Sequence, residues 1–174
     1  MLKLIKLTKE YEKQIADMLD EWKEDLERNN KKPIPGPVFR NDHRDMDKYI
    51  RELEYKTATD EIVPDSVFFL LDEERDILLG AVHIRHYLNK ALSEWSGHIG
   101  IGIRPGERRK GYATIMLSLA LDECRKLGIS TVQITCDKEN IGSARAIVKN
   151  SGVLDREFTN PDGVVRQTYH IAIS

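Results

Sequence analysis

From Ser66 onward, the spacing of apolar residues changes repeatedly between the two-residue period of a strand and the longer period of a helix. The segments Ser66–Asp72 and Ile77–Tyr87 are rich in strand-forming residues and are separated by a charged turn. The segment Tyr112–Leu127 is apolar over a helical length, and Gly128 after it suits the left-handed end of a helix. This alternation predicts a mixed α/β domain.

The other elements are expected on the same grounds. Met1–Leu7 alternates like a strand, and Thr8 is expected to cap a helix that runs to about Arg28. Alternate prolines favour an extended, stiff loop over Asn29–Asn41. Further expected elements are helices at Asp45–Lys56 and Asn140–Asn150, strands at His98–Arg104, Thr131–Asp137, Val153–Thr159 and Val164–Ile173, and a turn at Asn160–Gly163.

Length and composition limit the function classes. The 174 residues suit a single domain, and a hydrophobic fraction of 40% with a net charge of −2 excludes disorder and a global nucleic-acid-binding design. No apolar stretch is long enough to span a bilayer, and the first residues lack the apolar core of a signal peptide. Cys124 and Cys136 have no metal-ligand spacing and are too few for a disulfide scaffold. We therefore expect a reduced cytoplasmic protein without metal, nucleic-acid partner or membrane partner.

Charge concentrates between the His98–Arg104 strand and the helix that begins at Tyr112. Arg104, Arg108, Arg109 and Lys110 against Glu107 give four cations minus one anion, or +3. Free backbone N–H groups at a helix start favour an anion, and the small Gly111 and Ala113 allow a ligand to approach the backbone. The segment predicts a polyanion site, most simply for a pyrophosphate.

Two known phosphate loops do not fit this segment. Gly106 and Gly111 have the spacing of a Walker A loop, but Tyr112 and Ala113 stand where Lys and Ser or Thr are required. Gly100 and Gly102 begin a dinucleotide fingerprint, but Pro105 occupies the third glycine position. A nucleotide-phosphate enzyme is therefore disfavoured.

The pattern Ile103-x-x-x-x-Arg108-x-x-Gly111-x-Ala113 resembles the acyl-CoA pyrophosphate motif of the GNAT superfamily of acetyl-CoA-dependent N-acetyltransferases. The order of elements over Leu78–Val153 is also that of the family. The resemblance implies a mixed, mostly antiparallel central sheet flanked by helices. In that fold the strands at 98–104 and 131–137 would splay apart and form the acyl-CoA slot.

The resemblance also implies how acetyl-CoA would be held. The pyrophosphate would accept hydrogen bonds from backbone N–H groups in the loop, and pantetheine would pair with the backbone near Ile101 and Ile103. Asn140 matches a family asparagine beside the cofactor, although its plainer role is the N-cap of the next helix. The implied loop residues are Arg108, Arg109, Lys110, Gly111, Tyr112, Ala113 and Thr114.

The chain departs from the family in its second C-terminal helix. Many members carry a tyrosine there that protonates the departing thiolate, whereas Ser143–Asn150 contains none. Candidate general bases are His98 and Glu94, with His86 as a weaker one. His98 is preferred because strand alternation places it opposite the isoleucines, beside space left by the neighbouring glycines. Tyr169 as a substitute acid and Cys136 as a nucleophile are weighed and disfavoured.

The leading interpretation is an N-acetyltransferase that moves an acetyl group from acetyl-CoA to a primary amine by direct attack in a ternary complex. The alternative is a non-catalytic acyl-CoA-binding module. Residues 1–65 would form the acceptor side, which would bind a small-molecule or peptide amine, and residues 66–174 the acyl-CoA-binding core. Whether the chain forms a homodimer is left open.

Overall fold

The computed structural model describes residues 1–174 as two antiparallel sheets with helices on both faces. The strands are β1 (Leu2–Ile5), β2 (Asp65–Asp72), β3 (Ile77–Arg85), β4 (Ile99–Ile103), β5 (Thr131–Asp137), β6 (Val153–Thr159) and β7 (Val165–Ala172). The helices are α1 (Glu12–Asn29), α2 (Gly36–Arg40), α3 (Met46–Glu52), α4 (Lys90–Trp95), α5 (Tyr112–Lys126) and α6 (Ile141–Lys149), with short 3-10 turns at Lys9–Tyr11 and Pro105–Glu107.

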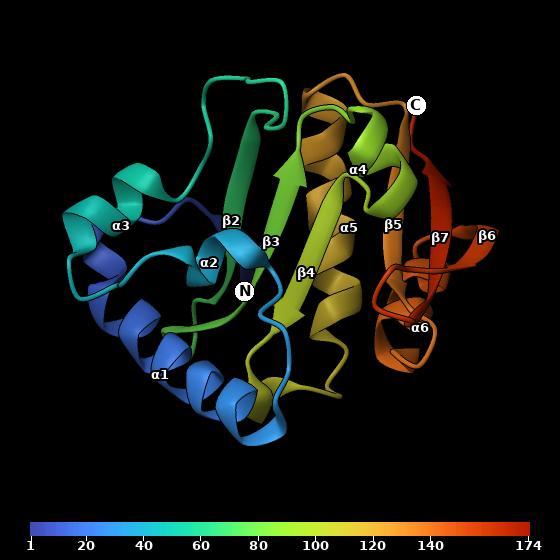
Figure 1. Cartoon of the computed structure of the whole chain (residues 1–174). Coiled ribbons are helices and arrows are strands. Elements are labelled where there is room, and N and C mark those ends of the chain that lie inside the picture. Colours follow the sequence, from blue (N-terminus) through green and yellow to red (C-terminus); the bar gives the residue numbers. More distant parts are fainter.

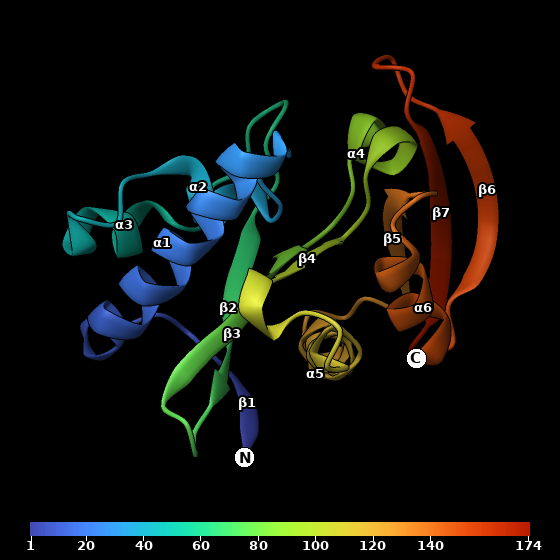
Figure 2. The same cartoon turned by 90° about the horizontal axis from the view of Figure 1, so that it is seen from below.

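The first sheet has the order β1-β2-β3-β4, with every neighbouring pair antiparallel. Helices α1, α2 and α3 lie on one face of this sheet and α5 on the other (Figures 1 and 2). A core that includes Trp22, Tyr49 and Phe69 fills the space under α1–α3. A second core, which includes Met116 and Leu117 of α5, joins the opposite face of this sheet to the second sheet.

The second sheet has the order β5-β7-β6, and α6 packs beside α5 against it. Figure 2 shows the two sheets as separate ribbons on either side of α5. The expected mixed α/β architecture with an antiparallel sheet and flanking helices is confirmed. None of the helices combines the length and the apolar character needed to cross a bilayer.

Two local expectations are wrong, and one helix was not expected. The proline segment is not extended throughout, because α2 forms within it with Pro37 in its first turn. Thr8 makes no side-chain cap, and a 3-10 turn precedes α1. The short helix α4 was not expected; Asn89 caps it by accepting a hydrogen bond from Leu92 N–H at 2.9 Å.

Candidate active site

The backbone between β4 and α5 presents a series of free donors. The amides of residues 109–114 have no acceptor within the chain. Arg109 and Gly111 both have positive φ angles, 63° and 87°, which turn successive N–H groups toward the same side. A Cβ built on Gly111 meets nothing within 4 Å, so the space in front of this backbone is open. The segment has the form of an anion-binding nest at a helix N-terminus.

The net charge of +3 expected from the sequence does not hold in space, because α1 supplies carboxylates. Arg104 pairs with Glu21, and Arg108 Nη1 lies 3.0 Å from Asp25 Oδ2. Glu107 is buried between Arg75 and Lys110, and their hydrogen bonds lower the pKa of its carboxyl to about 2.

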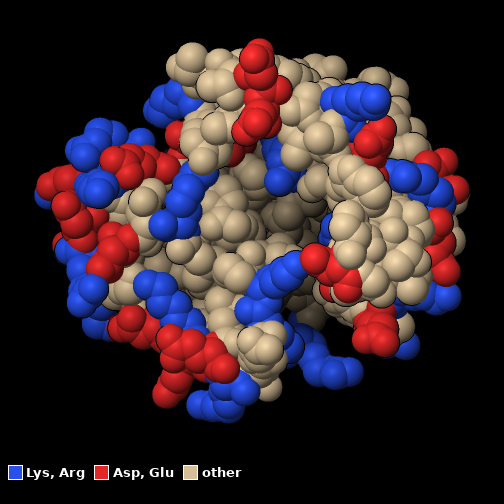
Figure 3. All heavy atoms as spheres, viewed as in Figure 1, with Lys and Arg blue, Asp and Glu red and all other residues tan.

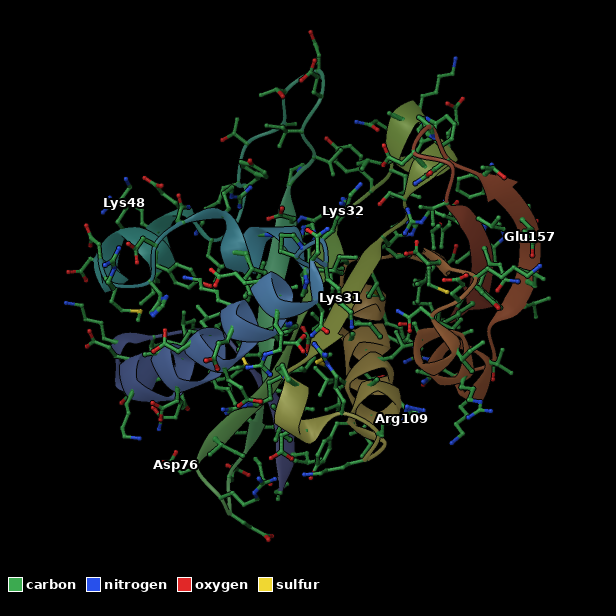
Figure 4. The ribbon with its side chains drawn as sticks, turned by 60° about the horizontal axis from the view of Figure 1, so that its bottom comes forward. Lys31, Lys32, Lys48, Asp76, Arg109 and Glu157 are labelled. Atoms are coloured by element: carbon green, nitrogen blue, oxygen red, sulfur yellow. The ribbon has the colours of Figure 1, made fainter.

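Arg109 is the one cation of the expected cluster that has no carboxylate partner. No carboxylate lies within 4.0 Å of its guanidinium. It is exposed and lies beside the start of α5 in Figure 4. Its charge is therefore free for a ligand.

The outer edge of β4 is also free. Arg85 N–H donates to His98 O at 2.7 Å, and Arg104 N–H donates to Leu79 O at 2.9 Å. The backbone N–H and C=O groups of the even-numbered residues between 98 and 104 therefore point toward β3. Alternation in an antiparallel ladder then directs the N–H and C=O groups of Ile99, Ile101 and Ile103 away from β3. Ile103 O accepts from Arg108 Nε at 3.0 Å, and the others have no partner.

The two sheets meet at His98 and Gln133. His98 N–H donates to Gln133 O at 2.8 Å, and Gln133 N–H donates to the imidazole Nδ1 of His98 at 3.0 Å. A Cβ on Gly97 would lie 2.4 Å from Gln133 O, and Gly97 has a φ of 152°, so only glycine fits this approach. No backbone hydrogen bond joins β4 to β5 beyond this point, so the strands separate from here toward the nest.

The same hydrogen bond fixes the proton on the ring of His98. Burial, with Arg85 and His170 nearby, lowers the pKa of His98, so the ring is neutral at pH 7. Because Nδ1 accepts from Gln133 N–H, the proton of the neutral ring lies on Nε2. His98 therefore presents a donor to its surroundings, and it would have to break its bond to Gln133 in order to accept a proton at Nδ1.

The sheet face opposite α5 is open at one point above β4. Figure 3 shows this face hollowed near its centre, with Lys and Arg side chains on the rim. A Cβ on Gly100 meets nothing within 4 Å, as expected. At Gly102 the expected space is filled, because Ile34 O and Trp22 would lie 2.5 Å from a Cβ there.

One ion pair joins the segment after α1, on the side of the first sheet, to the second sheet. Lys32 Nζ lies 2.8 Å from Asp162 Oδ2, which links the segment after α1 to the turn between β6 and β7. Lys31 and Lys32 lie over the middle of the molecule in Figure 4, between α1 and β5–β7. Both partners of the pair are exposed, so its contribution to stability is small.

The remaining candidates lie apart from this opening or have local partners. The Glu94 carboxylate is exposed on α4 and makes no hydrogen bond. His86 Nε2 lies 2.8 Å from Ser66 Oγ at the end of β3. Asn140 is the N-cap of α6, because its Oδ1 accepts from Ser143 N–H at 3.1 Å.

The two cysteines and Tyr169 are buried and are not positioned as reactive groups. Burial raises the pKa of the Cys136 thiol to about 11 and that of Cys124 to about 12, so both are neutral thiols of the core. The buried Tyr169 donates its hydroxyl to Gln167 Oε1 at 2.9 Å. No group of three or more His, Cys, Asp or Glu side chains is arranged to hold a metal ion.

A buried pair that the sequence analysis missed lies on β2 and β3. His83 Nε2 is 2.9 Å from Asp65 Oδ2, and both residues are at most 5% exposed. They line a cavity of about 290 Å³ together with Arg85, Arg40 and Tyr55. The only signal in the sequence is a histidine within the apolar segment Ile77–Arg85.

A larger groove, of about 700 Å³, lies between α1 and residues 39–46. Neither this groove nor the 290 Å³ cavity is lined by a residue of β4 or of the loop at 104–111, and the smaller cavity differs in being lined by His83 and Arg85 of the neighbouring β3.

The sequence that forms this nest and strand matches a known family. The model of the acetyltransferase (GNAT) family matches residues 15–152. The chain belongs to the GNAT acetyltransferase family. No curated protein has a sequence that matches this GNAT protein.

Solved structures with the same fold cover nearly all of this GNAT protein. A GNAT-family acetyltransferase from Bacillus anthracis has a TM-score of 0.67 at 16% identity, over 98% of this chain and 94% of that one. The microcin C7 self-immunity acetyltransferase MccE, in complex with acetyl-CoA and AMP, has a TM-score of 0.68 at 17% identity, over 99% and 92%. The spermidine/spermine N-acetyltransferase SpeG from Vibrio cholerae, in mutant forms, has a TM-score of 0.60 at 17% identity, over 99% and 95%.

Proposed function

We propose that this GNAT protein transfers the acetyl group of acetyl-CoA to a primary amine by direct attack in a ternary complex. The observation that carries the proposal is the separation of β4 from β5, with a free strand edge that leads from the His98–Gln133 contact to the nest at residues 109–114. Family membership supports acetyl transfer, and MccE is a solved relative in fold with acetyl-CoA bound.

Each part of the free backbone matches one part of acetyl-CoA. The amides of residues 109–114 would donate to the pyrophosphate, with Arg109 adding a free charge and Thr114 a hydroxyl that has no partner in the chain. Ile101 and Ile103 would pair with the amides of pantetheine as a neighbouring strand does. Close to the junction of the sheets, the edge-facing N–H of Ile99 or Ile101 would donate to the thioester carbonyl, where negative charge develops during attack.

The missing tyrosine on α6 costs little compared with the proton on the amine. A thiol with a pKa near 8.5 forms free thiolate at pH 7 at a cost of about 2 kcal/mol. An alkylammonium with a pKa near 10.4 must first lose a proton, which costs about 4.6 kcal/mol at pH 7. A general base therefore matters more than a general acid. His98 and Glu94 stay proposals for that role, and the tautomer of His98 weighs against it.

The test measures turnover and binding on the same protein. Release of free CoA thiol is followed with acetyl-CoA and a panel of amines, and acetyl-CoA affinity is measured by calorimetry. The proposal expects amine-dependent release with acetylated amine as product. Tight binding of acetyl-CoA without turnover of any amine would favour the alternative, a non-catalytic acyl-CoA-binding module.

A further inference from the structure

His83 is held by its neighbour in the orientation that a general base requires. Its Nε2 lies 2.9 Å from Asp65 Oδ2, and the second Asp65 oxygen accepts from Tyr55 N–H at 2.7 Å. A carboxylate can only accept, so Nε2 carries the proton and donates it to Asp65. The lone pair of the neutral ring is therefore on Nδ1.

This lone pair is free and accessible. Nδ1 of His83 has no hydrogen-bond partner, and Gln14 Oε1 is the only fully enclosed side-chain nitrogen or oxygen atom that lacks one. Nδ1 is therefore not fully enclosed, and the cavity is the space that His83 lines. His98 has the opposite arrangement, because its Nδ1 already accepts from Gln133 and its proton lies on Nε2.

The register of the sheet places His83 next to the acetyl-transfer position. His83 lies directly opposite Gly100 of β4, and it lies on the sheet face that is open above Gly100. Neighbouring strands are about 4.8 Å apart, so an acceptor amine bound above Gly100 would lie between the imidazole and the outer edge of β4. Figure 3 shows the hollow on this same face, and Figure 1, from the same side, shows the ribbon of β4 near the centre of the view.

The cavity also holds a cation that has no ion-pair partner. Arg85 is half-buried on β3, and its Nη1 donates to Gly97 O at 2.9 Å and to Ser96 Oγ at 3.1 Å. No carboxylate lies within 4.0 Å of its guanidinium. Burial lowers the pKa of Arg85, and Asp65 in the same cavity partly offsets this effect at longer range. Arg40 lines the same cavity, and it too has no carboxylate partner.

We propose that the cavity lined by Asp65, His83 and Arg85 is the acceptor site, in which His83 Nδ1 removes the amine proton and Arg85 binds a carboxylate of the same acceptor. The proposal rests on the proposed acetyl transfer and adds the substrate class, a primary amine that carries a carboxylate. Asp65 is a positioning residue, because it acts through His83.

The proton and bond changes balance without a further reactant. The overall reaction is R–NH₃⁺ + acetyl–S–CoA → acetyl–NH–R + HS–CoA + H⁺. His83 Nδ1 takes the first proton from the ammonium, the nitrogen forms its bond to the acetyl carbon, and the carbon–sulfur bond breaks. The second nitrogen proton ends on the sulfur, and the imidazolium, stabilised by Asp65, releases the first proton to solvent.

The variant His83→Gln tests the base. Glutamine can keep the donor to Asp65 but has no basic nitrogen, and we expect kcat to fall by about a hundredfold or more with acetyl-CoA affinity unchanged. The control is His86→Gln, which removes a histidine that is bonded to Ser66 and does not line the cavity. Melting temperatures of all variants separate loss of chemistry from loss of folding.

The pH dependence of kcat is a second test, because it would not change if His83 had only a structural role. The charged and titratable groups around His83 are Asp65 on β2, Arg85 on β3, Arg40 on α2, and Tyr55 and Glu61 from the segment after α3. Wild-type kcat should level off above the pKa of His83, whereas the kcat of His83→Gln should keep rising until the amine itself deprotonates. In Asp65→Asn, loss of the carboxylate should move the wild-type inflection to lower pH.

The substrate class is tested with L-amino acids and their carboxamides, and with spermidine as a polycation. Wild type should prefer the carboxylates, and Arg85→Gln should reduce the ratio of kcat/KM for acid over amide by about tenfold or more. Comparing the ratio between the two proteins cancels differences in amine basicity. A wild-type preference for spermidine, or a ratio unchanged by Arg85→Gln, would overturn the assigned class.

The results separate the two proposals. If wild type acetylates amines and His83→Gln does so at a rate within about threefold of it, the assignment of His83 is wrong while acetyl transfer stands. If wild type acetylates no amine, the proposed function fails and this assignment fails with it. If His83→Gln does not fold, the pH profile of Asp65→Asn decides, and an unmoved inflection would overturn the assignment.

Discussion

His98 and Gln133 bind each other through two hydrogen bonds, one from each backbone amide, at the point where the two sheets come together. Gln133 also donates its side-chain amide to Ser93 O at 2.8 Å, which ties the end of α4 to the same place. The imidazole of His98 is thus part of the joint between the sheets, and any test of its chemistry has to separate it from this structural role.

For His98→Ala we expect a loss of stability, because Gln133 N–H loses its acceptor in a buried position. Leaving such a donor unpaired costs about 1–3 kcal/mol. His98→Asn offers a carbonyl oxygen near the position of Nδ1 and should recover part of that loss. Urea unfolding of the three proteins measures the difference.

The activity of the same variants tests the base proposal for His98. Given the tautomer, we expect kcat per folded molecule to fall less in His98→Asn than in His83→Gln. A fall of about a hundredfold in His98→Asn with acetyl-CoA affinity unchanged would restore His98 as the base. Glu94→Gln is the next variant to compare.

For Gly111→Asp we expect acetyl-CoA affinity to fall by at least about a hundredfold, because a carboxylate would stand in front of the amides proposed to bind the pyrophosphate. Gly128→Asp is a matched control, since Gly128 also has a left-handed φ, 77°, and open space at its Cβ, but lies at the far end of α5. Both substitutions share the backbone strain. Calorimetry that finds equal losses, or no loss, in the two variants would contradict the placement of the pyrophosphate.

Acetyl-CoA should raise the melting temperature, because it would satisfy the free amides of β4 and of the nest only in the folded chain. At a hundred times its Kd, a ligand adds about 2.7 kcal/mol, or about 5–10 °C for a chain of this size. Thermal unfolding with acetyl-CoA and with adenosine as a control measures the shift. An equal shift with adenosine would show that the pantetheine and pyrophosphate contacts contribute nothing.

Stability should fall as the pH is lowered from 7 toward 5. Burial lowers the pKa of His43, His83 and His98 below the ordinary value of 6.5. Between the lowered pKa and 6.5 the unfolded chain binds protons that the folded chain does not, so stability is present above 6.5 and is lost below it. Each such histidine contributes a slope of up to about 1.4 kcal/mol per pH unit.

Urea unfolding at pH 7 and pH 5.5 measures this loss. His83→Gln should reduce the difference in the free energy of unfolding between the two pH values. Equal stability of wild type at both pH values would contradict the role given to burial.

The elements with a strong local pattern were predictable. β5 and β6 begin and end at the expected residues, because their alternation is set within a few positions and turn residues limit them. The N-cap at Asn140 and the left-handed Gly128 were expected for the same local reason. Helices α2 and α4 were missed because five or six residues carry too little periodicity to be seen.

The site was predictable only where it is made of consecutive backbone. The nest lies within one short segment, so its position follows from the glycine and the helix start. The net charge around the nest could not be predicted, because Glu21 and Asp25 come from a helix more than eighty positions away in the sequence. No local pattern marks His83 as a candidate base, because its orientation and tautomer depend on Asp65 in the neighbouring strand.

β4 runs from the point where the two sheets meet to the nest, so its length sets the distance between these two places. The five residues of β4 span about 17 Å. In the proposed binding mode, a thioester anchored by its phosphates at the nest would reach only as far as the His98–Gln133 contact, so the length of β4 would set the position of the acetyl group. Removing two residues from β4 would keep the alternation of the strand but carry the acetyl group about 7 Å past its partners. The number of residues in β4, as well as their identity, would thus determine where the acetyl group is held.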